Sequence, residues 1–350
     1  MIILKSPPDW LPVLLRTAVI GAAGGAVATW LNVPLSWMLG ALFATAAFAL
    51  AGMKLDMPKP LKLGSRICIG LILGTAINAE SFARIGQWPA SLALLVGGIA
   101  FITFLSALYY NRAAGFDRLT AVSASFPGGL SGITAIAIEQ GANAPASVTS
   151  QLFRLTAIVV LVPFVYAFWL GKPATMPAQE GLAFWVGQNL WIVLLAVPAW
   201  SLGRLVRLPA AELLAPMILA GGLGVAGFPL ELPIWLFALV FIVLGSTIGA
   251  RFRGITWRMV AALGGHSIIA TTCSLALVVG LAFPVAWVAD VPVYVALLAV
   301  APGGIAEMAM LAAVFGLDPV FVTFHQAFRS IVLYAIAPFL LARLASGASK

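Results

Sequence analysis

Two stretches of this chain place the same helix-breaking and polar residues in strongly hydrophobic surroundings. Residues 126–154 read FPGGLSGITAIAIEQGANAPASVTSQLFR, and residues 301–329 read APGGIAEMAMLAAVFGLDPVFVTFHQAFR. Each stretch contains Pro-Gly-Gly and ends with Gln-x-Phe-Arg, at one fixed offset along the chain. Polar and ionisable groups are costly inside a membrane, so the repeated motif indicates either a binding site or a structural device.

The arginines of the two motifs, Arg154 and Arg329, each lie about seven residues into an apolar run. A cation near the middle of a membrane helix costs roughly 2.5–3.5 kcal/mol on insertion scales, so it must face the bundle interior and find a partner. Gln151 and Gln326 precede them by one turn on the same helical face. These side chains either contact a solute, or they snorkel or cap the carbonyls of a neighbouring hairpin.

Pro-Gly-Gly interrupts an apolar run because proline lacks a backbone donor and glycine has little helical preference. The arms on either side, such as 118–126 and 130–139, are about ten residues, or roughly 15 Å of helix, which is half a bilayer. If the second arms are helices, their N-termini present free N–H groups to an anion near the midplane. The alternative is a pair of structural kinks. The tip residues predicted to bind a solute are Pro127, Gly128, Gly129, Ser131, Pro302, Gly303 and Gly304.

Glu307 completes the predicted site and has no acidic counterpart in the other copy, where Gly132 occupies its position. Its carboxylate can pair with Arg329, bind a coupling proton or sodium ion, or cap the start of its own helix. The two histidines, His266 and His325, are isolated from other ligand types, so we expect packed or hydrogen-bonded side chains. We predict no catalytic residue, no metal, no cofactor and no enzyme activity.

Composition places these motifs in a polytopic membrane protein. The 350 residues are 62% hydrophobic and 9% charged, too little charge for the surface of a soluble domain. The net charge of +8 comes from single or short groups of basic residues between apolar runs, which excludes a nucleic-acid partner and fits the positive-inside bias. Twelve apolar runs near 20 residues each, six in each half, predict membrane helices.

The chain is an internal duplication in which the second unit repeats the first at an offset of 175 positions. At this offset, residues 126–164 align with 301–339 without a gap, and ten of these 39 positions are identical. Identities that include Gln-x-Phe-Arg exceed what a hydrophobic alphabet supplies by chance. We therefore predict two membrane repeats, 1–175 and 176–350.

Orientation follows from the loop charges. If each Pro-Gly-Gly run enters and leaves on one side, nearly all loop Lys and Arg gather on the cytoplasmic side, as the positive-inside rule requires. Each half then crosses five times, and an odd number reverses the second half. The predicted fold is an all-α polytopic membrane protein of two inverted repeats, each with about five transmembrane helices plus a broken or re-entrant helical hairpin. Both termini would be cytoplasmic, in a bacterial inner membrane.

The motifs FPGGLSG and APGGIAE, with SQLFR and HQAFR, resemble those of the bacterial AbrB family of integral membrane proteins. The resemblance covers essentially the whole chain and implies two copies of one hydrophobic region. Members carry the label of regulators of gene expression, and many that of ammonia monooxygenases; no ligand residues come with the resemblance. Two isolated histidines argue against a copper monooxygenase, and the loops are too short for a DNA-reading module.

These observations favour a secondary transporter or exporter of a small, anionic solute held at the repeat interface. Arg154 and Arg329 would act as its charge or gating partners. The alternative is a membrane-embedded regulator of gene expression that senses a metabolite or binds a protein partner. The partners expected are the lipid bilayer, a small-molecule solute and a coupling ion (a proton or sodium). Substrate, direction and oligomeric state are left open.

Overall fold

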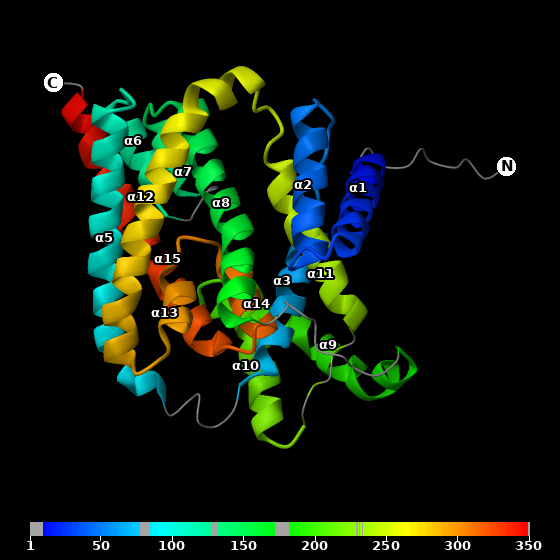
Figure 1. Ribbon diagram of the computed structural model, residues 1–350. Helices are drawn as coiled ribbons and strands as arrows, with labels where there is room; N and C mark the ends of the chain where they lie inside the picture. The colour runs from blue at the N-terminus through cyan, green and yellow to red at the C-terminus, as the bar shows by residue number, and fades with distance from the viewer. Residues whose placement is uncertain are drawn as a thin grey trace.

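The computed structural model describes residues 10–77, 84–127, 132–171, 182–228, 230, 232 and 234–348, and the elements in these ranges are all helical (Figure 1). The first half contains α1 (Trp10–Trp30), α2 (Ser36–Leu50), α3 (Lys59–Gly74), the short 3-10 helix η1 (Ile85–Gln87), α5 (Pro89–Arg112), α6 (Arg118–Ser125), α7 (Ile133–Glu139) and α8 (Ala144–Leu170). The second contains α9 (Leu182–Leu205), α10 (Ala211–Val225), α11 (Ile234–Ala250), α12 (Trp257–Ala289), α13 (Val293–Val300), α14 (Ile305–Val314) and α15 (Pro319–Ala348).

Helix bounds recur at the offset found in the sequence. Both ends of α2 and α6 reappear 175 positions later as the ends of α10 and α13, and α8 and α15 begin 175 positions apart. Left-handed residues recur with them: Leu35 and Ala210 precede α2 and α10 with φ of 49° and 46°. Gly52 and Gly227 follow the same two helices with φ of 91° and 92°. Glycine has no Cβ to oppose this conformation, so it stops both helices at the same place.

Five described helices, α1, α5, α8, α12 and α15, are long and apolar enough to cross a membrane. The helices α2, α3, α10 and α11 have only 15–17 residues, or roughly 22–26 Å at 1.5 Å per residue. The sequence predicted runs near 20 residues there. In α2 and α10 the left-handed residues just described confine the helix, with Gly52 following the end of α2 and Gly227 the end of α10.

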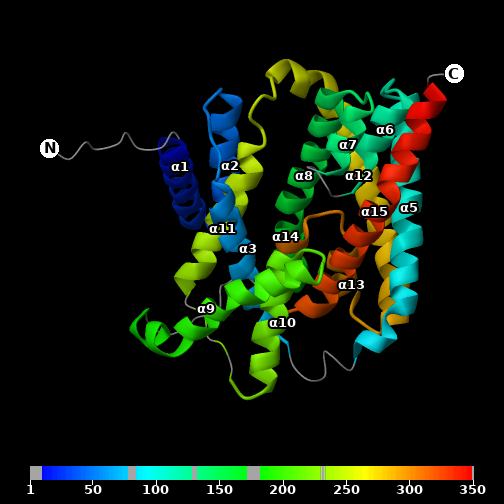
Figure 2. The same ribbon diagram turned by 180° about the vertical axis from the view of Figure 1, so that it is seen from behind.

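The helices pack in two groups, which lie side by side in Figures 1 and 2. The first, called here the lateral group, consists of α1, α2, α3, α9, α10 and α11. The second, called the hairpin group, consists of α5 to α8 and α12 to α15. The most extensive helix contacts, such as α2 with α11, α3 with α10 and α5 with α12, fall within a group, while α3 also touches α14.

Inside the lateral group the two halves exchange contacts. A Cβ built on Gly70 of α3 would meet the carbonyl oxygen of Leu213 in α10. A Cβ on Gly245 of α11 would meet that of Met38 in α2, which is the same contact moved by the repeat offset. Close approach of two backbones requires small residues at the crossing, so glycine sets both helix pairs at the same spacing.

The two broken segments lie near opposite ends of α8. Asn143, which caps α8, donates its backbone N–H to Thr120 Oγ1 at 2.8 Å, so the α6–α7 hairpin returns to the level at which it started. Near the other end of α8, the Tyr166 hydroxyl donates to the carbonyl of Tyr294, at the start of α13. Asn143 and Tyr166 are roughly 33–35 Å apart along a helix rising 1.5 Å per residue. In both ribbon views α6 and α7 lie above α13 and α14.

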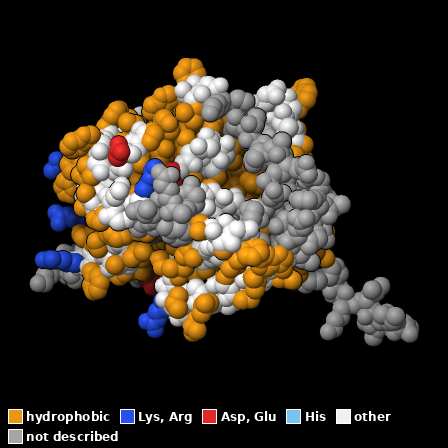
Figure 3. Space-filling view, turned by 90° about the horizontal axis from the view of Figure 1, so that it is seen from below, with side chains coloured by type: hydrophobic (Ala, Val, Ile, Leu, Met, Phe, Trp, Pro, Cys, Tyr) orange, Lys and Arg blue, Asp and Glu red, His pale blue; other side chains and the backbone are white. Residues whose placement is uncertain are grey.

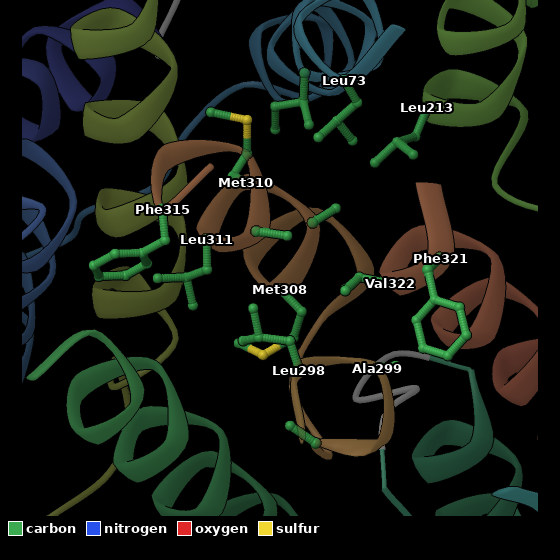
Figure 4. Close-up of a cluster of buried hydrophobic side chains, with 14 of the residues drawn as sticks. Leu73, Leu213, Leu298, Ala299, Met308, Met310, Leu311, Phe315, Phe321 and Val322 are labelled. Atoms are coloured by element: carbon green, nitrogen blue, oxygen red, sulfur yellow. The ribbon is translucent and has the colours of Figure 1, made fainter. Parts of the chain in front are cut away.

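Helix α14 is buried among its neighbours. Met308, Met310 and Leu311 are at most 1% exposed and pack with Leu73 and Leu213 of the lateral group (Figure 4). A helix that is apolar on all sides belongs in an interior. The periphery is apolar as well: Figure 3 shows hydrophobic side chains over much of the described part of one face, with Lys and Arg at only a few points. Large aromatic side chains such as Trp30 and Phe168 are 81% and 91% exposed.

Candidate functional site

In the first half, the Gln-x-Phe-Arg motif caps the end of α6. Arg154 Nη1 donates to the carbonyl of Ser125 at 2.9 Å, and Nη2 donates to that of Phe126. Gln151 Nε2 donates to the Ser123 carbonyl at 2.6 Å. A helix leaves its last four carbonyls without intrahelical donors, and α6 ends inside the protein. The guanidinium and amide therefore satisfy acceptors that no water reaches.

The second half repeats this geometry at α13. Arg329 donates from Nη1 to the Ala301 carbonyl at 2.5 Å and from Nη2 to that of Gly303 at 2.6 Å. Gln326 Nε2 donates to Leu298 at 2.7 Å and to Ala301 at 2.9 Å. Leu298 and Ala301 are 175 positions from Ser123 and Phe126, so two of the capped carbonyls are equivalent in the two copies. The third differs, being Ser125 in the first copy and Gly303 in the second. Of the roles considered for the arginines, the structure shows the capping of hairpin carbonyls.

The capping side chains of the two copies differ in which of their polar atoms have no hydrogen-bond partner. Gln151 Oε1 accepts a hydrogen bond from Thr134 Oγ1 at 3.0 Å. In the second copy Ala309 stands at the position of Thr134, and Gln326 Oε1 has no partner among the described residues. Arg329 Nε is also without a partner there. Both side chains are buried, and an unpaired buried polar group is costly. The second copy therefore lacks the hydroxyl that completes the hydrogen bonding of the glutamine in the first.

A cavity of about 590 Å³ lies between the lateral group and the hairpin group. Its walls are α3, α10 and α11 on one side and α8, α14 and α15 on the other. The volume falls in the range of small-molecule sites. Its polar and charged lining consists of Lys62, Ser65, Arg66, Gln151, Arg154, Glu212, Thr247, Arg251, Glu307, Arg329, Ser330 and Tyr334.

The cavity is cationic, because five of its lining residues are Lys or Arg and two are Glu. Arg66 and Glu212 form an ion pair of 2.7 Å between α3 and α10. Arg251 interacts electrostatically with Glu307 from the opposite wall. With its two carboxylates opposed by two of the cations, the cavity keeps an excess of positive charge. That excess favours an anionic occupant over a neutral or cationic one.

The start of α14 opens onto this cavity. Gly304 to Glu307 all line it, and the intrahelical bonds begin only with Met308 N–H to the Gly304 carbonyl at 3.0 Å. The Gly303 N–H is bonded to the Ala301 carbonyl at 2.9 Å, but the N–H groups of residues 304–307 are available to an anion, with the positive end of the helix dipole behind them. The Glu307 carboxylate lies against the Gly304 backbone.

Seven of the residues predicted to bind a solute line the cavity: Gln151, Arg154, Pro302, Gly303, Gly304, Glu307 and Arg329. Pro127 and Gln326 are buried and are not part of its lining, and Gly128, Gly129 and Ser131 lie outside the described residues. The sequence reasoning did not find Lys62, Glu212 and Arg251. Their only signal was a charge at the edge of an apolar run, which a membrane-surface residue also shows.

Neither histidine is placed to hold a metal in this cavity. His325 is buried, with its ring nitrogens 2.9 Å from Ser91 Oγ and from the Phe321 carbonyl oxygen. His266 Nδ1 lies 3.1 Å from the Tyr109 hydroxyl. Within the described ranges, no cluster of three or more His, Cys, Asp or Glu side chains has the geometry of a metal site.

The profile of one protein family matches residues 37–345, and its description reads Transition state regulatory protein AbrB. The chain belongs to the AbrB family. It is similar to the protein YhjN of Bacillus subtilis (strain 168), named as uncharacterized, with 27% identity over 91% of this chain and 90% of that protein. It is also 27% identical to a protein of Escherichia coli (strain K12) named as a candidate regulator, AbrB, over 88% and 89% of the two chains.

Proposed function

We propose that this AbrB-family protein is a secondary transporter or exporter of a small organic anion, which it moves without chemical change. The observation that best supports this proposal is the cavity of about 590 Å³, which is lined by five cations and the start of α14. The preorganised guanidinium groups favour carboxylates or phosphates, whose geometry matches their paired N–H donors. Solute-accessible cations inside an apolar bundle are the usual mark of a substrate pathway.

We further infer that repeats 1–175 and 176–350 have opposite orientations in a bacterial inner membrane, with both termini cytoplasmic. Three observations support this topology. The Gly70 and Gly245 contacts exchange under the repeat offset, the two hairpins lie near opposite ends of α8, and the loop cations then satisfy the positive-inside rule. Inverted repeats of this kind support alternating access around a central site.

The position of the cavity between two helix groups supports a mechanism in which the groups move relative to each other. A solute held between them would be exposed first to one side and then to the other. Glu307 is the candidate for the coupling ion, a proton or sodium, because its carboxylate lines the cavity beside the free N–H groups of α14. Protonation or cation binding there would offset the repulsion between this carboxylate and an anionic solute.

The experiment is a thermal-shift screen of the purified protein against carboxylates and phosphates, followed by counterflow in proteoliposomes. Arg251→Gln is the site variant, because its guanidinium lines the cavity while Arg154 and Arg329 hold hairpin carbonyls. Arg253→Gln, two residues further on and outside the cavity lining, is the matched control, since both arginines are exposed. A bound anion should lose about tenfold in affinity in Arg251→Gln, as expected for one charge-assisted hydrogen bond, and keep it in Arg253→Gln. If no anion stabilises the wild type, or both variants behave alike, the cavity is not the site.

A membrane sensor that regulates gene expression is the second candidate, and one asymmetry favours it. At the repeat offset, the counterparts of Lys62 and Arg66 are Phe237 and Phe241, which are 7% and 0% exposed. The basic side chains of Lys62 and Arg66, which line the cavity, therefore have no polar counterparts in the other repeat. A sensor needs access from one side only. Anion binding with no counterflow, under conditions in which vesicles hold their contents, would support the sensor over the transporter.

A further inference from the structure

A second cavity, of about 440 Å³, lies within the hairpin group between α5, α6 and α15. Its lining is almost wholly apolar. Along α15 it follows Val332, Leu333, Ile336, Leu340 and Leu344, and along α5 it runs from Val96 to Asn111. From Arg329 to Leu344 the α15 wall is roughly 22 Å long at 1.5 Å per residue. This cavity, called here the alkyl groove, has the dimensions of a site for a chain rather than a compact molecule.

Arg329 lines both cavities. It is 2% exposed, its Nη atoms are held by Ala301 and Gly303, and its Nε has no partner among the described residues. One buried guanidinium thus stands where a cationic cavity meets an apolar groove. A hydrocarbon chain alone would leave this cation without a counter-charge, and a small anion alone would leave the groove unfilled. A ligand with an anionic head and an alkyl tail satisfies both.

We propose that the solute is an anionic amphiphile, with a carboxylate or phosphate head on Arg329 in the cationic cavity and a single alkyl chain in the alkyl groove. This inference rests on the proposed binding of an anion and specifies its chemical class. The groove buries apolar surface of the chain, which contributes about fourfold in affinity per methylene. The head supplies orientation, because the free N–H groups of α14 and the guanidinium converge there.

A membrane phospholipid also combines an anionic head with alkyl chains, and its head would lie at the other end of the groove. Arg118 and Asn111 line that end, and Arg118 is exposed. A free amphiphile on Arg329 and a lipid on Arg118 place their charges at opposite ends of the groove. Replacement of Arg118 therefore distinguishes them without disturbing the arginines that hold hairpin carbonyls.

The test measures affinities for n-alkyl carboxylates from acetate to decanoate, by thermal shift of the full chain in lipid nanodiscs. Ala100→Phe, in α5, fills the groove. Ala93→Phe, also exposed on α5 but outside both cavities, is the matched control for bulk and for partitioning of the ligand into lipid. Alkanols of equal chain length control for the charge, and Arg118→Gln tests the lipid alternative.

The expected result is an affinity that rises about fourfold per methylene in the wild type, in Ala93→Phe and in Arg118→Gln. In Ala100→Phe the dependence on chain length should disappear, while short carboxylates still bind. The alkanols should bind at least tenfold more weakly than the carboxylates. Short anions that bind wild type with no gain from a longer chain would overturn the amphiphile inference and leave the anion transporter intact. Equal chain-length dependence in all variants, or its loss in Arg118→Gln, would overturn it too, and no binding by any anion would remove both proposals.

Discussion

The two broken hairpins use one capping device and differ in what it leaves unpaired. In the first copy, Gln151 and Arg154 hold the carbonyls that end α6, and Thr134 completes the hydrogen bonding of the glutamine. In the second, Gln326 holds the equivalent carbonyls of α13, but Ala309 supplies no hydroxyl and the glutamine Oε1 is left without a described partner. In both copies the glutamine and arginine donors stabilise a helix end. The copies differ in whether the glutamine Oε1 has a hydrogen-bond partner.

The Pro-Gly-Gly segment of the second copy lies at the cationic cavity. Pro302, Gly303, Gly304 and Glu307 line it, whereas the first copy has Gly132 at the position of Glu307. Mutations can therefore separate two roles of the duplicated unit, the capping of a helix end and the lining of the cavity. We expect capping of the broken helix to contribute to stability in both copies, while Glu307 at the start of α14 belongs to the second alone.

The largest expected effect is the loss of either capping arginine. Arg154→Met removes the donor to the carbonyls of Ser125 and Phe126, whereas Arg329→Met removes the donor to Gly303 and one of two side-chain donors to Ala301. At about 1–3 kcal/mol for each unsatisfied acceptor, we expect a loss of about 3–5 kcal/mol of stability in Arg154→Met and about 1–3 kcal/mol in Arg329→Met. Thermal unfolding of the purified proteins measures it, with the exposed Arg253→Met as the control. A wild-type unfolding temperature in either variant would show that the two copies do not share the device.

The next effect concerns the glycine contacts that recur in the lateral group. Gly70→Ala and Gly245→Ala place a Cβ against the carbonyls of Leu213 and Met38. Because backbone cannot move aside as a side chain can, each should lose about 1–3 kcal/mol or more. Gly64→Ala, in α3 with no heavy atom near its built Cβ, should gain up to about 1 kcal/mol from helix propensity. Unequal losses at Gly70 and Gly245, in thermal unfolding, would break the equivalence of the two helix pairs.

A smaller effect is expected when the hydrogen bonding of the first hairpin is made to match that of the second. Thr134→Ala leaves Gln151 Oε1 without its donor, as Gln326 Oε1 is in the other copy. We expect about 1–2 kcal/mol of destabilisation in thermal unfolding, the cost of one buried unsatisfied acceptor. Thr156→Ala, whose hydroxyl has no partner among the described residues, is the control and should change stability less. Equal effects would mean that Thr134 acts through packing.

The smallest expected effect on stability is at the mouth of the cavity. Glu212→Gln removes the ion pair with Arg66, which is partly exposed at 26% and 48% for the Glu212 and Arg66 side chains. Pairs of this kind contribute less than about 1 kcal/mol, so the unfolding temperature should barely move. Anion affinity should rise, because the cavity loses a negative charge and Arg66 becomes available. Weaker anion binding in the variant would contradict the assigned role of the cavity charges.

The sequence alone was sufficient to predict the all-helical class, the family and the recurrence of the broken runs. Each of these depends on local or repeated information. Pro-Gly-Gly breaks a helix wherever it occurs, and a charged fraction of 9% over the whole chain excludes a soluble surface. The position of both arginines inside apolar runs also predicted that they would face the interior and find a partner, with snorkelling to the interface as the alternative.

Only the tertiary structure decided which partners those arginines take. Capping and solute binding both place a guanidinium in the interior, and the choice depends on where the carbonyls of Ser125 and Ala301 point after the chain has folded. The cavity itself joins Lys62, Glu212 and Arg251, which are far apart in the sequence and come together only because α3, α10 and α11 pack across from α14. Local sequence specifies which residues break or charge a helix, whereas the packing of helices from both halves determines which of those residues face the same space.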